Sequence, residues 1–466
     1  MKLPRILLAA GASGSGKTLI TCGLLQALVN RGLRTASFKC GPDYIDPMFH
    51  SRVIGTKSRN LDTFFTSPEI TRYLLATDAA DCEIAVMEGV MGFYDGVGGT
   101  TTRASAYDLA SVTDTPVILI VNSKGMSVSL AAYIKGFLEY RGDSHIGGVI
   151  FNQMSPMLYP RMKKLVESEL GIPALGYVPR VEDCVIESRH LGLVLPDEIP
   201  ELKGRLAKLA EVLEKSLDID GILKLARSAP DMDISVESVS NKSFRLESVV
   251  RVGVARDEAF CFFYEDNFRL LREMGAELVF FSPMHDGKLP ENLDGLLLYG
   301  GYPELNGAAL EANRTMREQI RDALMGGLPC MAECGGFMYL HEEMEGMDGK
   351  FYRMAGFLPG KAYRTPKLTR FGYITLEQRQ PVFGTEDLGA IPAHEFHYFD
   401  SDNCGSAFHA GKPESTRGWD CIHGTDSLMA GFPHLYYYGN SKVPQAFLKK
   451  CLEYQKQRKT ERRVSR

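Results

Sequence analysis

A glycine-rich stretch near the start of the chain has the residue types and spacing that bind a nucleoside triphosphate. Residues 11–18 read Gly-Ala-Ser-Gly-Ser-Gly-Lys-Thr and match the pattern G-x-x-x-x-G-K-T in full. In such a loop, glycines let backbone N–H groups face the phosphates, the lysine neutralises their charge, and the threonine hydroxyl ligates Mg²⁺. The pattern therefore predicts a site for ATP and Mg²⁺ at Gly11, Gly14, Gly16, Lys17 and Thr18.

A cysteine in the second half of the chain has the local sequence of a nucleophile. Cys334 follows a short apolar run and precedes two glycines, a pattern that predicts a sharp turn between a strand and a helix. A thiol at a helix start is expected to have a lowered pKa, because the partial positive charge there stabilises the thiolate. Backbone N–H groups around this turn are candidates for an oxyanion hole, namely those of Gly300, Gly301 and Gly335.

The thiol needs a base to take and return a proton, and three histidine settings compete for that role. They are the pair His394 and His397, then His423, and then His434. Sequence spacing alone does not choose between them. The two patterns together predict an enzyme that uses ATP to activate a group and a thiol to supply its replacement.

Carboxylates follow two of the predicted strands in the first half. Asp43 and Asp46 come after the second strand, and Glu88 ends the third. Because the carboxyl ends of parallel strands form the ligand crevice, we expect all three near Thr18, where they would suit Mg²⁺. The alternative for the two aspartates is that they shape a turn. Asn152, at the end of a later strand, is a candidate for reading the adenine edge.

The elements that must position these residues alternate between short β-branched runs and amphipathic stretches. This rhythm predicts a doubly wound, mostly parallel sheet in an α/β fold. Ser67, Pro68 and Glu69 predict a helix start, with a capping hydroxyl and a proline at the first helical position. The predicted strands are Arg5–Ala10, Arg34–Lys39, Glu83–Met87, Val117–Val121, Gly148–Phe151 and Ala174–Val178, and the helices are Thr18–Asn30, Val128–Tyr140 and Leu158–Leu170.

A segment rich in Ser, Asp and Glu interrupts this rhythm and then a second alternating series begins. We predict an ATP-binding domain at 1–225, a linker at 226–247, a second α/β domain at 248–455 and a basic tail at 456–466. The tail is expected to be a solvated, frayed terminus. In the second domain the expected strands are Val249–Ala255, Glu277–Phe281, Leu296–Tyr299 and Cys330–Glu333, with helices at Asn267–Met274 and Ala308–Leu324.

Composition excludes several classes of function. A net charge of −5 over 466 residues argues against a nucleic-acid binder. No apolar run reaches the roughly 18 residues of a membrane span. The ten cysteines are scattered without a CxxC pair, which favours free thiols in a reducing cytoplasm. Most of them, including Cys330, are expected to be core residues.

The stretches 39–47, 88–92, 300–304, 332–336 and 394–398 resemble those of the cobyrinic acid a,c-diamide synthase family, and the resemblance covers nearly the whole chain. The resemblance implies a first domain similar to dethiobiotin synthetase and a second similar to class I glutamine amidotransferases. It also implies Cys334 as the nucleophile, His434 as its base, and Lys17, Thr18, Asp43, Asp46 and Glu88 around ATP, Mg²⁺ and the carboxylate substrate. Further candidates for substrate contacts are Tyr44, His394 and His397.

The chain departs from the expected pattern at two positions. Amidotransferase triads commonly place Glu two residues after the histidine, but here that residue is Tyr436, so Cys334 and His434 are expected to act as a dyad. The family usually has a small hydroxyl residue where this chain has Phe399.

The resemblance implies ATP- and L-glutamine-dependent amidation of the a and c carboxylates of cobyrinate through acyl phosphates. One alternative is the same chemistry on nickel-sirohydrochlorin. Another is a regulatory ATPase whose second domain is an inert binding module. A homodimer is a further expectation.

Overall fold

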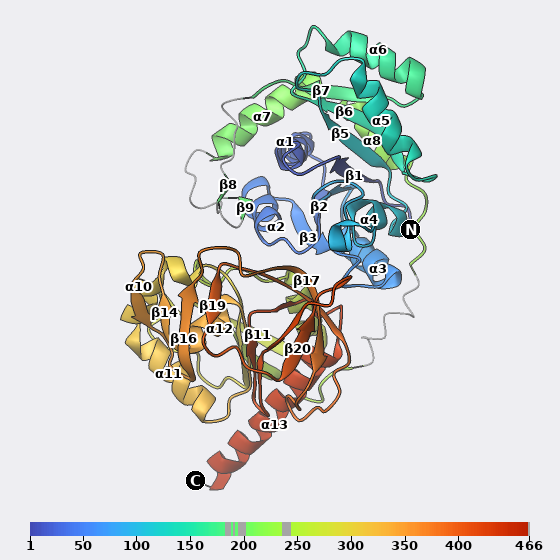
Figure 1. The fold of residues 1–466 in the computed structure, drawn as a ribbon. Coiled ribbons are helices and arrows are strands. Elements are labelled where there is room, and N and C mark those ends of the chain that lie inside the picture. Colours follow the sequence, from blue (N-terminus) through green and yellow to red (C-terminus); the bar gives the residue numbers. More distant parts are fainter. Residues whose placement is uncertain (182–187, 190–191, 194–201, 235–243, 465–466) are drawn as a thin grey trace. The chain divides into compact units, whose positions relative to one another are not determined.

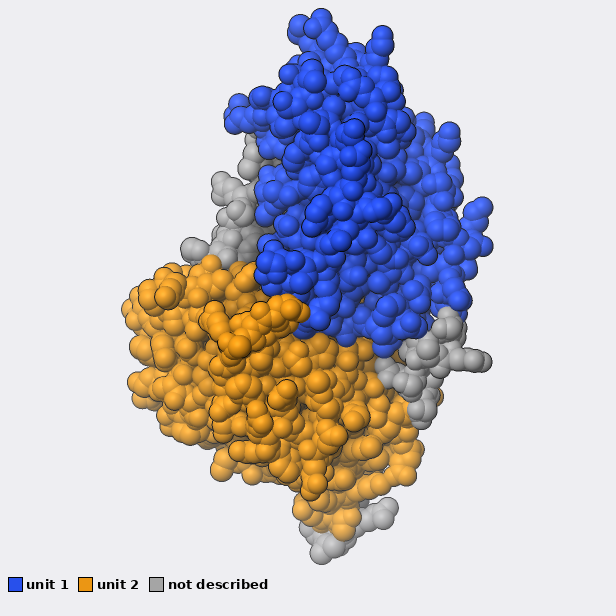
Figure 2. Space-filling view, turned by 45° about the vertical axis from the view of Figure 1, so that its right-hand side comes forward, with its two compact units in different colours: residues 1–239 blue, residues 240–466 orange. Residues whose placement is uncertain are grey.

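The chain divides into two compact units, residues 1–239 and 240–466, which Figure 2 colours blue and orange. The computed structural model describes all residues except 182–187, 190–191, 194–201, 235–243 and 465–466. The predicted linker, 226–247, includes this division, but its residues 235–243 lie outside the described part. Helix α8 (Ile219–Arg227) ends within the predicted linker and belongs to the first unit.

The first unit is built on a seven-stranded sheet in the order β3-β2-β4-β1-β5-β6-β7 (Figure 1). Every neighbouring pair is parallel, so the prediction of a mostly parallel α/β sheet is confirmed. Strand β3 was not predicted, because its residues, Lys-Ser-Arg-Asn-Leu, are mostly polar and lie at the sheet edge. The strands are β1 Arg5–Ala10, β2 Thr35–Cys40, β3 Lys57–Leu61, β4 Ile84–Glu88, β5 Val117–Asn122, β6 Ile146–Asn152 and β7 Ala174–Val178.

Helices alternate with these strands, as parallel connections require. The predicted start of α3 is present, because the Ser67 side chain accepts a hydrogen bond from the Ile70 N–H at 3.4 Å and Pro68 is the first helical residue. The α-helices are α1 Lys17–Asn30, α2 Ile45–Phe49, α3 Pro68–Asp78, α4 Ala106–Val112, α5 Ser129–Glu139, α6 Tyr159–Leu170, α7 Leu202–Ser216 and α8. Two short strands, β8 Ser188–Arg189 and β9 Gly192–Leu193, pair with each other in antiparallel orientation.

Helix α1, which follows the phosphate loop, is buried between the sheet and α7. This packing fixes the position of α1. A Cβ atom at Gly23 of α1 would lie 2.4 Å from the Leu213 side chain and 2.8 Å from that of Leu209, both on α7. The hydrophobic cluster of this unit joins residues of β1, α1 and α7. A glycine at position 23 therefore lets the two helices approach closely.

The second unit is built on a six-stranded sheet in the order β11-β10-β12-β13-β23-β22, parallel except for β22. The expected helix Ala308–Leu324 is instead two helices, because Asn313 interrupts it and caps the second one through Met316 N–H. The elements are β10 Val250–Ala255, α9 Glu265–Glu273, β11 Ala276–Phe281, β12 Gly295–Leu298, α10 Gly307–Ala312, α11 Arg314–Met325, β13 Cys330–Glu333, α12 Gly335–Leu340, β22 His423–Gly424 and β23 Leu428–Gly431.

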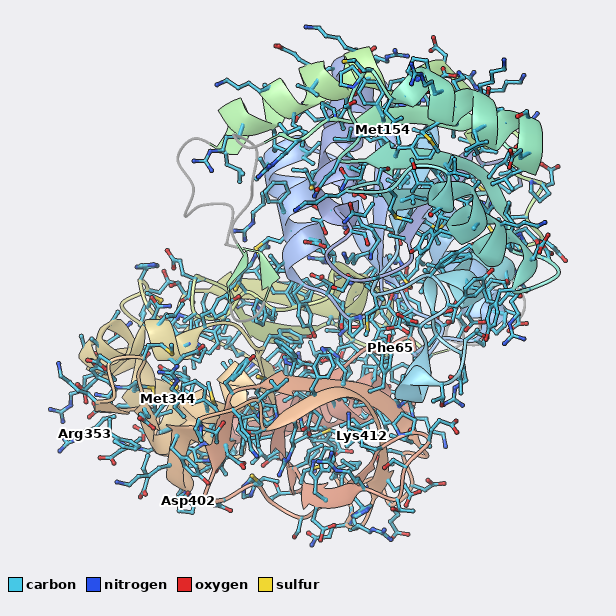
Figure 3. The ribbon with its side chains drawn as sticks, turned by 45° about the horizontal axis from the view of Figure 1, so that its top comes forward. Phe65, Met154, Met344, Arg353, Asp402 and Lys412 are labelled. Atoms are coloured by element: carbon cyan, nitrogen blue, oxygen red, sulfur yellow. The ribbon has the colours of Figure 1, made fainter. Side chains whose placement is uncertain are left out.

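Two smaller sheets complete the second unit. One has the order β15-β14-β16-β19, and Figure 3 labels Met344 on β14 and Arg353 on β15. The other is antiparallel in the order β21-β20-β17-β18-β24. Their strands are β14 His341–Glu345, β15 Phe351–Arg353, β16 Leu358–Arg364, β17 Arg370–Gln378, β18 Ile391–His397, β19 Phe399–Ser401, β20 Phe408–Gly411, β21 Gly418–Cys421 and β24 His434–Leu435.

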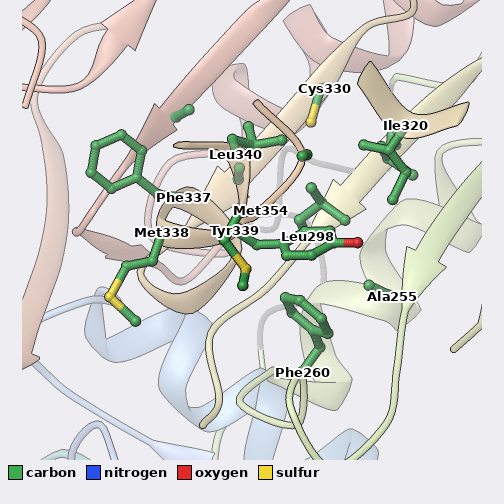
Figure 4. Close-up of a cluster of buried hydrophobic side chains, with 14 of the residues drawn as sticks. Ala255, Phe260, Leu298, Ile320, Cys330, Phe337, Met338, Tyr339, Leu340 and Met354 are labelled. Carbon is green, nitrogen blue, oxygen red and sulfur yellow. The ribbon is translucent and has the colours of Figure 1, made fainter. Parts of the chain in front are cut away.

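The core of the second unit surrounds the strand that leads to Cys334. Figure 4 shows part of this cluster, including Phe260, Leu298, Tyr339 and Cys330. Cys330 is fully buried, so its predicted role as a core residue is confirmed. Cys334, the candidate nucleophile, therefore lies in a densely packed part of the fold.

The basic tail differs from the expected frayed terminus. Helix α13 (Lys442–Val464) continues through it. The Arg458 guanidinium donates to Asp294 Oδ1 at 2.7 Å, and Lys456 pairs with Glu247. These contacts anchor the last turns of the helix to the second unit. Among the described residues, no helix is both long and apolar enough to cross a membrane.

Candidate active sites

The phosphate loop joins β1 to α1 in the conformation that its glycines allow. Gly16 precedes the helix with φ 89° and Gly14 has φ 74°, both in the left-handed region that favours glycine. The Lys17 ammonium donates to the carbonyl oxygens of Ala12 at 3.1 Å and Met91 at 2.5 Å. Burial, and then the nearby Lys39, lower the pKa of Lys17 to about 8. A phosphate group in the loop would offer this ammonium a stronger acceptor than a carbonyl.

Asn152 contacts the phosphate loop rather than pointing away from it. Its side-chain N–H donates to the Ser15 carbonyl oxygen at 2.8 Å, and its Oδ1 accepts from the Gln153 N–H at 2.9 Å. A Cβ atom at Gly16 would lie 2.3 Å from the Asn152 amide nitrogen. The side chain thus holds the loop at Gly16, and its contact with adenine stays a prediction.

A buried cluster of charged groups lies where β2 and β4 end, next to the loop. The Lys39 ammonium donates to Asp46 Oδ2 at 2.5 Å and to Glu88 Oε1 at 2.7 Å. The Thr18 hydroxyl donates to the same Glu88 oxygen at 2.6 Å. Lys39 and Glu88 are register partners on adjacent parallel strands, which explains why residues 49 positions apart meet. The structure therefore brings Glu88 and Asp46 together with Thr18 through Lys39.

Lys39 is a residue of this site that sequence reasoning missed as a functional group. Burial alone would lower the pKa of this ammonium, but Asp46, Glu88 and Asp43 raise it well above its ordinary value. The signal that could have identified it is its place at the end of a buried strand, where a lysine needs a partner. It is the counter-ion of the three carboxylates.

Asp43 has the turn-shaping role that was the alternative for it. Its Oδ1 accepts hydrogen bonds from the N–H groups of Ile45 at 2.9 Å and Asp46 at 3.0 Å, at the start of α2. Burial, and then the Asp46 charge, raise the pKa of Asp43 to about 7. Tyr44 lies between them in the sequence and immediately precedes α2.

The carboxylates do not form a metal cage of their own. Within the described residues there is no group of three or more His, Cys, Asp or Glu side chains placed to hold a metal ion, and the binding of Mg²⁺ by Asp43, Asp46 and Glu88 stays a prediction. The donors still fit Mg²⁺, which is usually bound by one or two protein oxygens together with phosphates and water. Thr18 and Glu88 provide such oxygens, and the second Glu88 oxygen is buried without a hydrogen-bond partner.

Cys334 lies on the predicted sharp turn between β13 and α12. It has φ 46° and ψ −105°, a strained conformation for a non-glycine residue of the kind that occurs at functional sites. Its N–H donates to the Gly431 carbonyl oxygen at 2.8 Å. A Cβ atom at Gly336 would lie 2.0 Å from the Leu298 carbonyl oxygen, so the turn requires glycine there.

The expected lowering of the thiol pKa is wrong for this structure. Burial, and then the nearby Glu304 carboxylate, raise the pKa of Cys334. A hydrogen bond from the Gly335 backbone favours the thiolate, but it does not offset burial. Cys334 is therefore a thiol at rest, and it depends on a base to remove its proton.

Of the three histidine settings, His434 lies next to Gly300 and Cys334, and its role as the base stays a prediction. A Cβ atom at Gly300 would lie 2.6 Å from His434 Cε1, 3.5 Å from His434 Nε2 and 3.4 Å from Cys334 Cβ. Gly300 thus occupies the narrow space beside both the thiol and the imidazole, and a side chain there would clash. Burial, and then His397, lower the pKa of His434 to about 3, so the imidazole is neutral and can accept a proton.

The other histidines have different partners. His394 lies opposite His434 in the β18–β24 pairing, and the two rings stack with centroids 4.9 Å apart. Burial, then His434 and then Lys412, labelled in Figure 3, lower the pKa of His394. His397 contacts Glu395 Oε2 at 3.1 Å, and His423 contacts the Asn403 carbonyl oxygen at 2.9 Å. Substrate contacts of His394 and His397 stay predictions.

The three oxyanion candidates come from two neighbouring segments, Gly300 and Gly301 from just after the end of β12 and Gly335 from the start of α12. A Cβ atom at Gly335 would lie 3.2 Å from the Gly301 nitrogen, so these two backbone N–H groups are neighbours. The Gly300 carbonyl accepts from the Phe262 N–H at 2.9 Å, which holds the loop in place. The geometry places backbone donors beside Cys334, where charge would develop on a carbonyl oxygen.

The fold and these two sites define a class: an α/β enzyme with a P-loop nucleotide site in one unit and a class I amidotransferase-like thiol site in the other. Residues 6–193 match the model of the CobQ/CobB/MinD/ParA nucleotide binding domain, and residues 251–439 match that of the CobB/CobQ-like glutamine amidotransferase domain.

Full-length relatives narrow this class. Cobyrinate a,c-diamide synthase of Thermoplasma volcanium is 36% identical over 459 residues, which cover 98% of this chain and 99% of that one. The synthase of the same name from Priestia megaterium is 35% identical over 466 residues, with 98% of both chains covered. The chain therefore belongs to the cobyrinate a,c-diamide synthase family, whose members are ATP-dependent ligases with a glutamine amidotransferase domain.

Proposed function

We propose that this chain amidates the a and c side-chain carboxylates of cobyrinate, with ATP as the activating group and L-glutamine as the nitrogen donor. The observation that carries the proposal is the pairing of two chemistries in one chain: Thr18 and Glu88 beside the phosphate loop, and Cys334 and His434 around Gly300. The names of the full-length relatives support cobyrinate as the substrate. We assign activation to residues 1–225, glutamine hydrolysis to 248–455, and linker and tail to 226–247 and 456–466.

In the first step a substrate carboxylate oxygen attacks the terminal phosphorus of ATP, and ADP leaves. The product is an acyl phosphate, which has a good leaving group that a free carboxylate lacks. The loop N–H groups and the Lys17 ammonium hold the phosphates and offset the charge that moves onto ADP. Mg²⁺ would be held by Thr18 and Glu88, and when bound it neutralises phosphate charge.

In the second step the glutamine side-chain amide is cleaved at Cys334. His434 Nε2 takes the thiol proton while sulfur bonds to the amide carbon, and the carbonyl electrons move to an oxyanion at Gly301 and Gly335. The C–N bond breaks as His434 returns the proton to nitrogen, so ammonia leaves and a glutamyl thioester remains. Water then hydrolyses the thioester to glutamate and regenerates the thiol.

In the third step unprotonated ammonia attacks the acyl phosphate carbon. The C–O bond to phosphate breaks, inorganic phosphate leaves, and the nitrogen loses a proton to give the primary amide. The sequence of steps then repeats on the second carboxylate.

We also propose that the chain forms a homodimer, which sedimentation of the purified chain would test.

The substrate is tested by incubating the full chain with ATP, Mg²⁺ and glutamine and with either cobyrinate or nickel-sirohydrochlorin. Two successive exchanges of a hydroxyl for an amino group on cobyrinate, counted by mass spectrometry, are expected. Amidation of nickel-sirohydrochlorin alone would show that nickel-sirohydrochlorin, and not cobyrinate, is the substrate. ATP hydrolysis without amidation of either compound would favour a regulatory ATPase.

Replacement of Lys17 is expected to stop carboxylate activation. Lys17→Ala removes the cation that faces the terminal phosphates, so ADP formation that depends on cobyrinate, with ammonium chloride as nitrogen donor, should fall by roughly 10²-fold or more. Lys163→Ala is the matched control, since Lys163 lies on α6 and pairs with the half-buried Glu167 at 3.7 Å. Wild-type ADP formation by Lys17→Ala would contradict the assignment of the phosphate loop.

A further inference from the structure

The glutamate that immediately precedes the nucleophile lies against its base. Glu333 is the last residue of β13 and is 5% exposed. Its Oε2 lies 3.6 Å from His434 Nδ1. Amidotransferase triads commonly have an acid where this chain has Tyr436, and the Tyr436 hydroxyl donates to Asp266 Oδ2 at 2.9 Å.

The two edges of the His434 ring face different groups. The Cε1–Nε2 edge borders Gly300 and Cys334, as the distances from a Gly300 Cβ atom indicate. The Nδ1 edge faces Glu333. In a base that takes a proton at Nε2, Nδ1 must carry the hydrogen, and a carboxylate at that side holds this tautomer.

The backbone on both sides of this contact is held by hydrogen bonds. Glu333 and Gly431 are register partners on β13 and β23, and the Leu435 backbone hydrogen-bonds the Glu333 carboxyl group. The Asn267 side chain donates to the Leu435 carbonyl oxygen at 2.9 Å and accepts from the Tyr437 N–H at 2.8 Å. These two hydrogen bonds from Asn267, a residue of α9, hold the strand that carries His434 in place.

We propose that Glu333 is the positioning residue of the glutaminase site: it accepts the Nδ1 hydrogen of His434 and stabilises the imidazolium that forms when His434 takes the thiol proton. The nucleophile and the group that orients its base are thus consecutive residues. On a strand, consecutive side chains point to opposite faces, and the sharp turn at Cys334 is what lets both serve one histidine. The proposal rests on glutamine hydrolysis at Cys334.

The burial of Glu333 and His434 disfavours an isolated charge on either side chain. It raises the pKa of Glu333 to about 8 and lowers that of His434 to about 3, because an isolated charge is unfavourable in a dry site. The other Glu333 oxygen, Oε1, is buried without a hydrogen-bond partner. When His434 takes the thiol proton, a Glu333 carboxylate beside it offsets the charge of the imidazolium.

The test measures glutaminase kinetics of Glu333→Gln in the full chain. The amide keeps the shape but not the charge, so kcat should fall by roughly 10²-fold with KM for glutamine within a factor of about three, because a transition-state interaction is lost. The decisive measurement is made in a His434→Ala background. There, Glu333→Gln should lower the residual rate no further, since Glu333 acts through His434.

Control variants separate the possible outcomes. Tyr436→Phe removes a hydroxyl that contacts Asp266 and should keep the wild-type kcat. If thermal unfolding shows that Glu333→Gln does not fold, kcat and KM are measured for Glu333→Ser instead, with the same expected results. A wild-type kcat in Glu333→Gln, or an equal loss in the His434→Ala background, would overturn the inference. Failure of the proposed function is distinct, because Cys334→Ser would then still hydrolyse glutamine.

Discussion

The Cys334→Ser variant is expected to lose glutamine-dependent amidation and to keep ammonium-dependent amidation. A serine hydroxyl on the same turn is a much weaker nucleophile than the thiol, and removal of a nucleophile costs roughly 10³-fold or more in kcat. The acyl phosphate forms at the other site, where Cys334 has no part. Product formation is followed by mass spectrometry, with glutamine in one reaction and ammonium chloride in the other.

Cys404→Ser is the matched control for this experiment. Cys404 is a free, partly buried thiol of the same unit, and it contacts Asp400 rather than a histidine. It should use both nitrogen donors at wild-type rates. Unchanged glutamine use by Cys334→Ser would remove Cys334 from the mechanism, whereas loss of both activities would show that the substitution disturbs more than ammonia supply.

The Lys39→Met variant is expected to be strongly destabilised. Methionine fills the same volume but leaves Asp46 and Glu88 without the ammonium that lies 2.5 and 2.7 Å from them. Removal of one partner from a buried ion pair costs about 3–5 kcal/mol. Thermal and urea unfolding of the full chain would measure the loss of stability.

The loss should depend on pH in a defined direction. Carboxylates without a counter-ion take up protons in the folded state, so the folded variant binds more protons than the unfolded chain. Its free energy of unfolding therefore falls as pH rises, and the deficit relative to wild type should be larger at about pH 8 than at about pH 5.

Lys135→Met is the control for this substitution. It breaks an exposed helical pair with Glu139 at 3.6 Å and should cost less than about 1 kcal/mol. A Lys39→Met variant as stable as this control would contradict the role of Lys39 as a counter-ion.

Local sequence determined the parts of this protein that depend on neighbours along the chain. The spacing of residues 11–18 predicted the phosphate loop, and Ser67 with Pro68 predicted the start of α3. Cys334 with its two glycines predicted the turn of the nucleophile. These patterns are sufficient because a turn or a cap is decided by the conformations of a few consecutive residues.

The tertiary structure decided which distant side chains meet and how charged they are. Spacing could not choose among the histidines, but the tertiary structure brings His434 to Gly300 and Cys334, which supports the proposal of His434 as the base. Strand register brings Lys39 to Glu88, and the helix-start argument gave the wrong direction for the Cys334 pKa because burial outweighs it. The acid that seemed to be missing at Tyr436 is present at Glu333, visible only once β13 and β24 lie in one site. Contacts of this kind depend on register and burial, which no stretch of consecutive residues contains.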